Sequence, residues 1–171
     1  CWFMKSTDDC RTWSEPRKFT EGPDGGFGNG PVTVLKSGKV LCNVGSNFTD
    51  EELDKPDRVE RLLVMCSEDN GDSFHRYAEV KGIPGNHGMA ESGVCELENG
   101  ELILIPRRTG QIYRSADEGR TWSEPELIGL DIYEPHILRF PNNVLACVHG
   151  SYNAGGLRVV LSGDDGYTWH G

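Results

Sequence analysis

The sequence lacks a basic surplus, a long apolar run and any closely spaced pair of cysteines. Its 27 acidic residues outnumber its 17 lysines and arginines, which gives a net charge of −10. An acidic chain without a basic stripe repels phosphates, so we expect no nucleic-acid partner. No apolar run approaches the roughly 18 residues of a membrane-spanning helix, so we also expect no membrane span.

The N-terminal residues, Cys-Trp-Phe-Met, have no charged region followed by an apolar one, so we expect that they are not a signal peptide. They are typical of the middle of a strand, and we expect the chain to begin inside a larger fold. The compartment is not identified, although a secreted or periplasmic location is slightly favoured over a cytoplasmic one.

None of the six cysteines belongs to a CxxC pair, so we expect no zinc knuckle, no other metal and no cofactor. Four of them lie in apolar, strand-like runs: Cys42, Cys66, Cys95 and Cys147. A free cysteine in such a run behaves as a small buried hydrophobe. We therefore expect structural free thiols, with disulfides as the alternative.

Glycine, in contrast, is abundant. It accounts for 22 of 171 residues, about 13%, which is nearly twice the usual ~7%. Without a collagen period, this much glycine indicates many tight turns and hence many short strands. No helix of useful length is evident, and the mean hydropathy of −0.49 suits thin layers. We therefore predict an all-β fold.

A short motif, S-x-D-x-G-x-[TS]-[WF], occurs four times. Its copies begin at Ser6, Ser67, Ser115 and Ser162, which are 61, 48 and 47 residues apart. The Ser and Asp side chains bond nearby backbone amides and hold a turn, in which the Gly supplies a positive φ. The aromatic residue then packs beneath the turn. Cys10 replaces the Gly in the first copy, so we expect that turn to be looser or shaped differently.

A second repeat, two short apolar strands around a Gly or Asn turn, precedes three of these boxes and is typical of a β-hairpin. It occupies residues 31–42, 93–104 and 135–146. A third strand precedes each of these boxes and a fourth follows each internal one. Four strands in about 47 residues are typical of a blade of an antiparallel β-propeller, so 171 residues give about 3.6 blades.

The expected division places the end of one blade in residues 1–27, whole blades in 28–85 and 86–130, and a partial fourth in 131–171. An acidic insertion, residues 46–57, interrupts the second blade and carries a glycosylation sequon that is meaningful only in a secreted protein. Because open sheet edges invite pairing, we expect further blades or self-association to close the ring.

The four boxes resemble the Asp-boxes, or bacterial neuraminidase repeats, of the sialidase (neuraminidase) superfamily, and the resemblance covers essentially the whole chain. It implies a six-bladed propeller in which three arginines hold the sialic acid carboxylate. An Asp serves as acid/base, and a Glu assists a Tyr nucleophile. Asp-boxes lie on the outer edge, away from the site, and they also occur in non-catalytic propellers.

The segment from Glu91 to Arg107 is similar to the family stretch in which the Glu opens the innermost strand and the second arginine closes the next one. A hairpin returns the chain, so both residues are expected at one end of the blade. By resemblance, Glu91 would activate a tyrosine and Arg107 would bind a carboxylate in bidentate fashion. The alternative is a plain cross-strand ion pair.

Other family positions fall outside the chain or are changed. The first arginine and the catalytic Asp would precede the first box, the Tyr would follow the last, and Ala154 stands at the third arginine's position. We therefore expect this chain alone to lack a complete site and to turn over no fluorogenic sialoside.

Hairpin geometry places further polar residues at the same end as Glu91, and these are candidate substrate-binding residues: His87, Arg108, Glu134, His149 and Tyr152. Glu134 holds the position in the fourth blade that Glu91 holds in the third. Two carboxylates near a propeller axis suit the acid and base of glycoside hydrolysis. Ordinary loop polarity is the alternative for each residue.

The resemblance implies a retaining, sialidase-like glycoside hydrolase that acts on a terminal acidic sugar through a covalent glycosyl intermediate. The expected partner is therefore a glycan or sugar acid. The alternative, from a different functional class, is a non-catalytic propeller that binds glycans or proteins.

Overall fold

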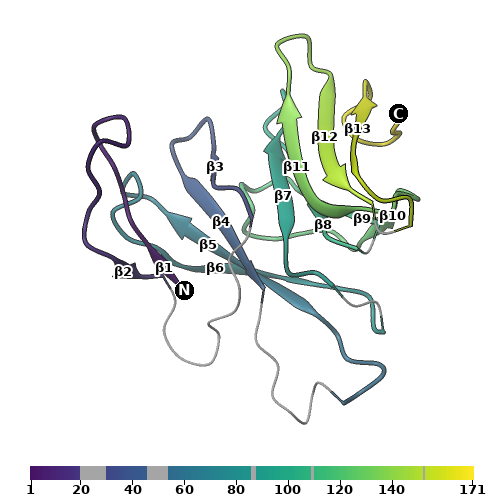
Figure 1. Ribbon diagram of the computed structural model, residues 1–171, viewed down its shortest axis with the longest axis horizontal. Helices are drawn as coiled ribbons and strands as arrows, with labels where there is room; N and C mark the ends of the chain where they lie inside the picture. Colours follow the sequence, from purple (N-terminus) through teal and green to yellow (C-terminus); the bar gives the residue numbers. More distant parts are fainter. Residues whose placement is uncertain (20–29, 46–53, 86–87, 109, 152) are drawn as a thin grey trace.

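The computed structural model describes residues 1–19, 30–45, 54–85, 88–108, 110–151 and 153–171. Within these ranges the chain contains 13 strands and no helix, and therefore no helix that crosses a membrane (Figure 1). The prediction of an all-β fold is confirmed. The His87 and Tyr152 positions lie outside the described residues.

The strands form four antiparallel sheets that follow one another along the chain (Figure 1). The first sheet pairs β1 (Trp2–Phe3) with β2 (Arg17–Lys18). The second has four strands in sequence order: β3 (Thr33–Val34), β4 (Val40–Gly45), β5 (Arg61–Ser67) and β6 (His75–Lys81).

The third sheet repeats this order: β7 (Ser92–Glu96), β8 (Leu102–Pro106), β9 (Gln111–Ser115) and β10 (Glu126–Leu127). The fourth contains β11 (Tyr133–Arg139), β12 (Leu145–Gly150) and β13 (Leu157–Ser162), with a single further bridge between Leu161 and His170. The predicted hairpins are therefore present, and the strand before each box pairs with a neighbouring strand in an antiparallel sheet.

Apolar side chains fill the space between each pair of neighbouring sheets. Strand β8 illustrates the cause, because successive strand residues point to opposite faces. Leu102 and Leu104 join the cluster shared with the second sheet, whereas Ile103 and Ile105 join the cluster shared with the fourth. A third cluster, around Phe19 and Met65, lies between the first two sheets. The second and third sheets are thus thin layers with an apolar cluster on each face.

The repeated boxes build one turn. In the third copy, the Ser115 hydroxyl accepts a hydrogen bond from Gly119 N at 2.8 Å and donates to Asp117 Oδ1 at 2.8 Å. Thr121 donates its backbone N–H and its hydroxyl to the two Asp117 oxygens, at 2.8 and 2.6 Å. Trp122 then packs against the cluster between the second and third sheets. The last three boxes thus anchor an aromatic side chain between two sheets, Phe74, Trp122 and Trp169 respectively.

The expectation of a different first turn is wrong. Cys10 adopts a φ of 64°, in the left-handed region that glycine occupies in the other copies. Its backbone N–H donates to Ser6 Oγ at 2.9 Å, and Thr12 bonds both Asp8 oxygens as its counterparts do. The Ser and Asp hydrogen bonds therefore hold the turn even where the residue carries a Cβ.

We expect the boxes to make stability sensitive to acid. Hydrogen bonds from the Thr168 hydroxyl and backbone N–H lower the pKa of Asp164 from 3.8 to about 2. A pKa that is lower in the folded state stabilises the fold above about pH 4, and this stabilisation is lost as the pH falls toward 2. The urea midpoint should drop between pH 5 and pH 2, and the drop should be smaller in Asp164→Asn. Equal drops in both proteins would contradict this account.

None of the six cysteines forms a disulfide, as expected for the four in apolar runs. Cys66, Cys95 and Cys147 are buried, and burial raises the pKa of the Cys147 thiol to about 12. Within the described ranges, no group of three or more His, Cys, Asp or Glu side chains is arranged to hold a metal ion.

Candidate active site

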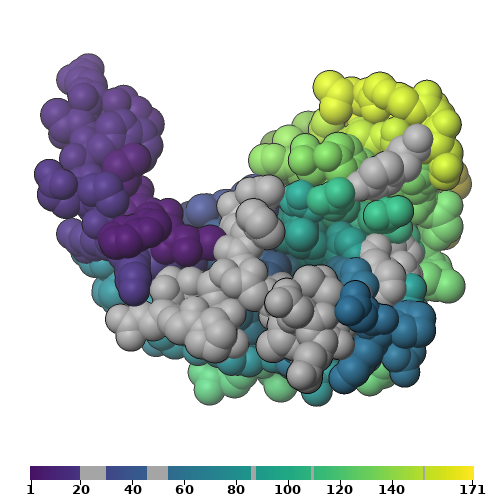
Figure 2. All heavy atoms as spheres, turned by 60° about the horizontal axis from the view of Figure 1, so that its bottom comes forward, coloured from purple at the N-terminus to yellow at the C-terminus, as the bar shows by residue number. Residues whose placement is uncertain are grey.

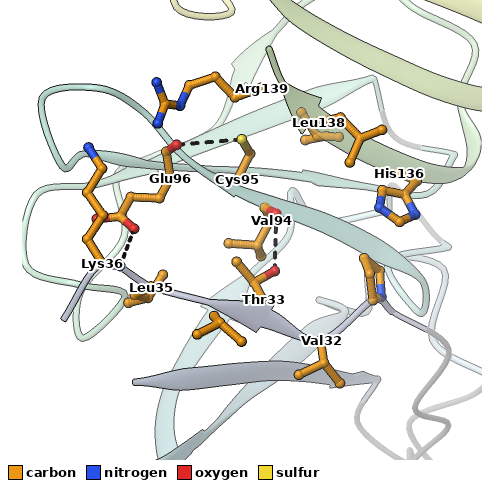
Figure 3. Close-up of a pocket in the computed structure, with 13 residues that line it drawn as sticks. Val32, Thr33, Leu35, Lys36, Val94, Cys95, Glu96, His136, Leu138 and Arg139 are labelled. Carbon is orange, nitrogen blue, oxygen red and sulfur yellow. Dashed lines mark hydrogen bonds between the residues drawn. The ribbon is translucent and has the colours of Figure 1, made fainter. Parts of the chain in front are cut away.

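The first strands of three successive sheets, β3, β7 and β11, lie side by side and line a pocket of about 440 Å³ (Figure 3). Thr33 Oγ1 on β3 donates to the Val94 carbonyl on β7 at 3.2 Å. On the other side of β7, a Cβ on Gly93 would lie 2.9 Å from the Pro135 carbonyl. Glycine at position 93 therefore permits the close approach of β11.

A second pocket, of about 550 Å³, lies where these three strands begin, and we call it the mouth pocket. It is lined by Gly30, Pro31, Glu91, Glu134, Pro135 and His136. Pro31 and His136 also line the first pocket, so the two pockets adjoin. Two of the predicted site residues, Glu91 and Glu134, thus lie at one pocket.

Glu91 and Arg107 are joined as the hairpin predicts. Ser92 pairs with Pro106, so the residues just outside the ladder face each other, and Arg107 N donates to the Glu91 carbonyl at 2.6 Å. The Arg107 Nη1 atom lies 2.7 Å from Glu91 Oε1 and 2.6 Å from Oε2. The Glu91 residue is only 6% exposed. A buried carboxylate needs such a cation, because an unpaired charge away from water is strongly unfavourable.

Tyr133 supports the arginine from the neighbouring sheet. The Arg107 Cζ atom lies 4.8 Å from the centroid of the Tyr133 ring, within the range of a cation–π contact. Tyr133 begins β11 and pairs with Gly150 on β12. The guanidinium therefore lies between a carboxylate on its own sheet and an aromatic ring on the next.

Glu134 owes its place to an irregularity in β11. The register between β11 and β12 shifts between Tyr133 and His136, and Glu134 adopts a φ of 49°. A glutamate in the left-handed region is strained, and both bulges and strained residues are common next to functional sites. The irregularity leaves the Glu134 side chain exposed while it lines the mouth pocket.

Arg108 and His149 lie near this end of the sheets, but neither is among the described residues that line the mouth pocket. Arg108 has a φ of 66°, and its Cβ lies 2.9 Å from the position of a Cβ on Gly88. His149 is 3% exposed and its Nδ1 lies 2.6 Å from the Gly150 carbonyl oxygen. The mouth pocket is thus lined by Glu91 and Glu134. Arg107 is not one of the described lining residues either, but its guanidinium contacts Glu91.

The sequence did not point to Glu60, which lies directly before β5 and is 9% exposed. Its Oε2 atom accepts hydrogen bonds from the backbone of Gly88 at 2.5 Å and Met89 at 2.7 Å. Its Oε1 atom accepts one from Arg58 Nη2 at 3.4 Å. No motif marks this residue, because its partners lie 28 and 29 positions away in the chain.

The family model of the BNR repeat-like domain matches residues 1–171. A sialidase from Bacteroides fragilis (strain YCH46) is 32% identical over 134 residues, which cover 71% of this chain and 22% of that protein. A solved structure of a protein of unknown function from Dyadobacter fermentans DSM 18053 has a TM-score of 0.77 at 21% identity, over 94% of this chain and 47% of that one. The structure of the Hadza microbial sialidase Hz136 has a TM-score of 0.75 at 23% identity, over 98% and 35%.

The chain therefore spans about a fifth of the length of the curated relative and less than half of either solved chain. The structural likeness concerns the fold of the antiparallel sheets. The family model covers every residue, and the sequence of the curated sialidase is similar over most of the chain. The chain therefore belongs to the BNR repeat-like domain family.

Proposed function

We propose that this chain supplies part of the active site of a sialidase-like glycoside hydrolase that acts on a terminal acidic sugar. The observation that carries the proposal is the mouth pocket, where Glu91 and Glu134 line one cavity and Arg107 is bonded to Glu91. Two carboxylates flanking a sugar are the usual equipment of glycosidases. The guanidinium of Arg107, beside Glu91, matches the planar carboxylate of a sugar acid.

In this proposal the groups have separate roles. Arg107 binds the sugar carboxylate while the Tyr133 ring keeps its guanidinium in place. Glu91, as the resemblance to sialidases implies, acts as the base for a nucleophilic tyrosine. Glu134, on β11 of the next sheet, serves as the general acid or base at the glycosidic bond. The reaction then retains the anomeric configuration through a glycosyl intermediate.

We further propose that the sheets are blades of a propeller whose axis lies along β3, β7 and β11, with the blade boundaries predicted from the sequence. Exposed apolar side chains at both ends of the chain support the proposal that additional sheets or a second copy cover them. Trp13 of the first box is 53% exposed, whereas Trp122 and Trp169 pack into clusters. On β13, Leu157, Val159 and Leu161 are also exposed. Figure 2 shows the N-terminal segment and the last sheet at opposite ends of an open gap.

The test uses the full-length protein that carries these residues and a panel of fluorogenic glycosides. We expect hydrolysis of the sialoside and little of neutral hexosides, with proton NMR revealing an α-anomer product first from an α-linked substrate. Hydrolysis confined to neutral sugars would exclude an acidic substrate. Glycan binding without any turnover would replace this proposal with a non-catalytic, glycan-binding propeller.

A further inference from the structure

We propose that Glu60 is a positioning residue for Glu91, and that its buried carboxylate fixes the segment that carries Glu91 into the mouth pocket. The proposal rests on the function proposed above. Glu60 lies directly before β5 of the second sheet, whereas Glu91 lies directly before β7, the first strand of the third. The charge of Glu60 therefore holds, across two sheets, the segment that precedes Glu91.

Two consecutive backbone N–H groups converge on one oxygen of Glu60. Gly88 N and Met89 N lie 2.5 and 2.7 Å from Oε2. Successive amides that point at one anion form a small binding concavity, and hydrogen bonds to a charged acceptor are about twice as strong as neutral ones. Here the anion is a side chain of the protein itself, so the concavity serves to hold the backbone.

The Glu60 backbone is fixed as well. Its carbonyl accepts a hydrogen bond from Gly82 N at 2.8 Å, just after β6. Met89, which is fully buried, packs against Gly82 so closely that a Cβ there would collide with the Met89 sulfur. The Glu60 main chain is therefore fixed by the strands β5 and β6, and its partner Met89 is fixed by the apolar cluster.

The other side of the segment is bounded by the two arginines. Gly88, with a φ of 119°, lies against the Arg108 side chain, and Arg108 N donates to the Ile132 carbonyl at 2.6 Å. The Glu91 carbonyl accepts from Arg107 N. Residues 88–91 are thus held between Glu60 and the strand that carries Arg107. Loss of the Glu60 charge frees one side of this segment and shifts Glu91 relative to the pocket.

The experiment compares Glu60→Gln with Glu101→Gln in the full-length protein. Glu101 is the matched control, because it also pairs with an arginine, Arg114 at 3.3 Å, but lies at the opposite end of the β7–β8 hairpin. In NMR spectra, Glu60→Gln should move the amide protons of Gly88 and Met89 upfield and also shift the Glu91 amide and Arg107 side-chain signals. Glu101→Gln should leave all four unchanged.

The kinetic arm measures kcat and KM separately. Misplacement of a reacting group lowers the rate on the order of 10- to 100-fold, so Glu60→Gln should lower kcat by that factor with little change in KM. Glu60→Asp keeps the charge on a shorter side chain and should recover part of the lost kcat. This recovery distinguishes the loss of the charge from a general folding defect.

The two arms separate this inference from the proposed function. If the Gly88 and Met89 signals move while the Glu91 and Arg107 signals stay in place, Glu60 fixes only residues 88 and 89. The inference is then overturned. If all four signals move in a protein without hydrolase activity, the positioning role stands and the proposed function fails.

Discussion

Arg107→Lys is expected to lower kcat/KM for an acidic-sugar glycoside by about 10²- to 10³-fold in the full-length protein. In the structure, Arg107 Nη1 lies within 2.7 Å of both Glu91 oxygens, and the guanidinium lies over the Tyr133 ring. Lysine keeps the charge but loses the planar fork that matches a carboxylate and stacks on an aromatic face. Steady-state kinetics on the sialoside measures the loss.

The matched control is Arg139→Lys. Arg139 also forms a short ion pair, with Glu98 at 2.6 Å, but it lies at the far end of β11 from the mouth pocket. We expect its kcat/KM to stay within twofold of the unsubstituted protein. If Arg107→Lys also stayed within twofold, the Glu91–Arg107 contact would be a structural cross-strand ion pair, and the proposed role of Arg107 would be wrong.

Leu104→Ala is expected to lower the free energy of unfolding by about 2–5 kcal/mol. Leu104 lies on β8, is fully buried, and packs in the cluster between the second and third sheets. Removal of its side chain leaves a cavity that two hydrogen-bonded sheets cannot close. The midpoint and slope of urea unfolding measure the change.

Leu127→Ala in the same sheet provides the comparison. Leu127 ends β10 and is 72% exposed, so its truncation should cost less than about 0.5 kcal/mol. A similar loss in both variants would mean that the clusters between sheets do not carry the stability of the fold. A small loss in Leu104→Ala alone would indicate that the sheets shift to fill the space.

Much of the fold could be predicted because its determinants are local. The Ser, Asp and Thr of each box are at most six residues apart, and their hydrogen bonds close within the box. The hairpin between 93 and 104 fixes its own register, which is also why Glu91 and Arg107 meet. The first turn keeps the shape of the others despite Cys10, because the hydrogen bonds of the box outweigh the steric preference for glycine.

The rest of the site depends on contacts between distant segments. Arg108 is directed by a positive φ after β8, and His149 by the face of β12 on which it lies. The Glu134 position depends on an irregularity that no turn motif announces. Glu60 meets its partners only once two sheets have packed together. The hairpin pattern predicts the end of the sheet at which a residue lies, but not the direction of its side chain.

The most direct test of the central claim is a crystal structure of the full-length protein with a bound sugar acid such as N-acetylneuraminic acid. The claim is that the mouth pocket, lined by Glu91 and Glu134 and with Arg107 bonded to Glu91, recognises an acidic sugar. We predict density for the sugar ring between the two glutamates and for its carboxylate within hydrogen-bond distance of the Arg107 guanidinium. A sugar acid bound elsewhere, with the Glu91–Arg107 pair and the mouth pocket unchanged, would contradict it.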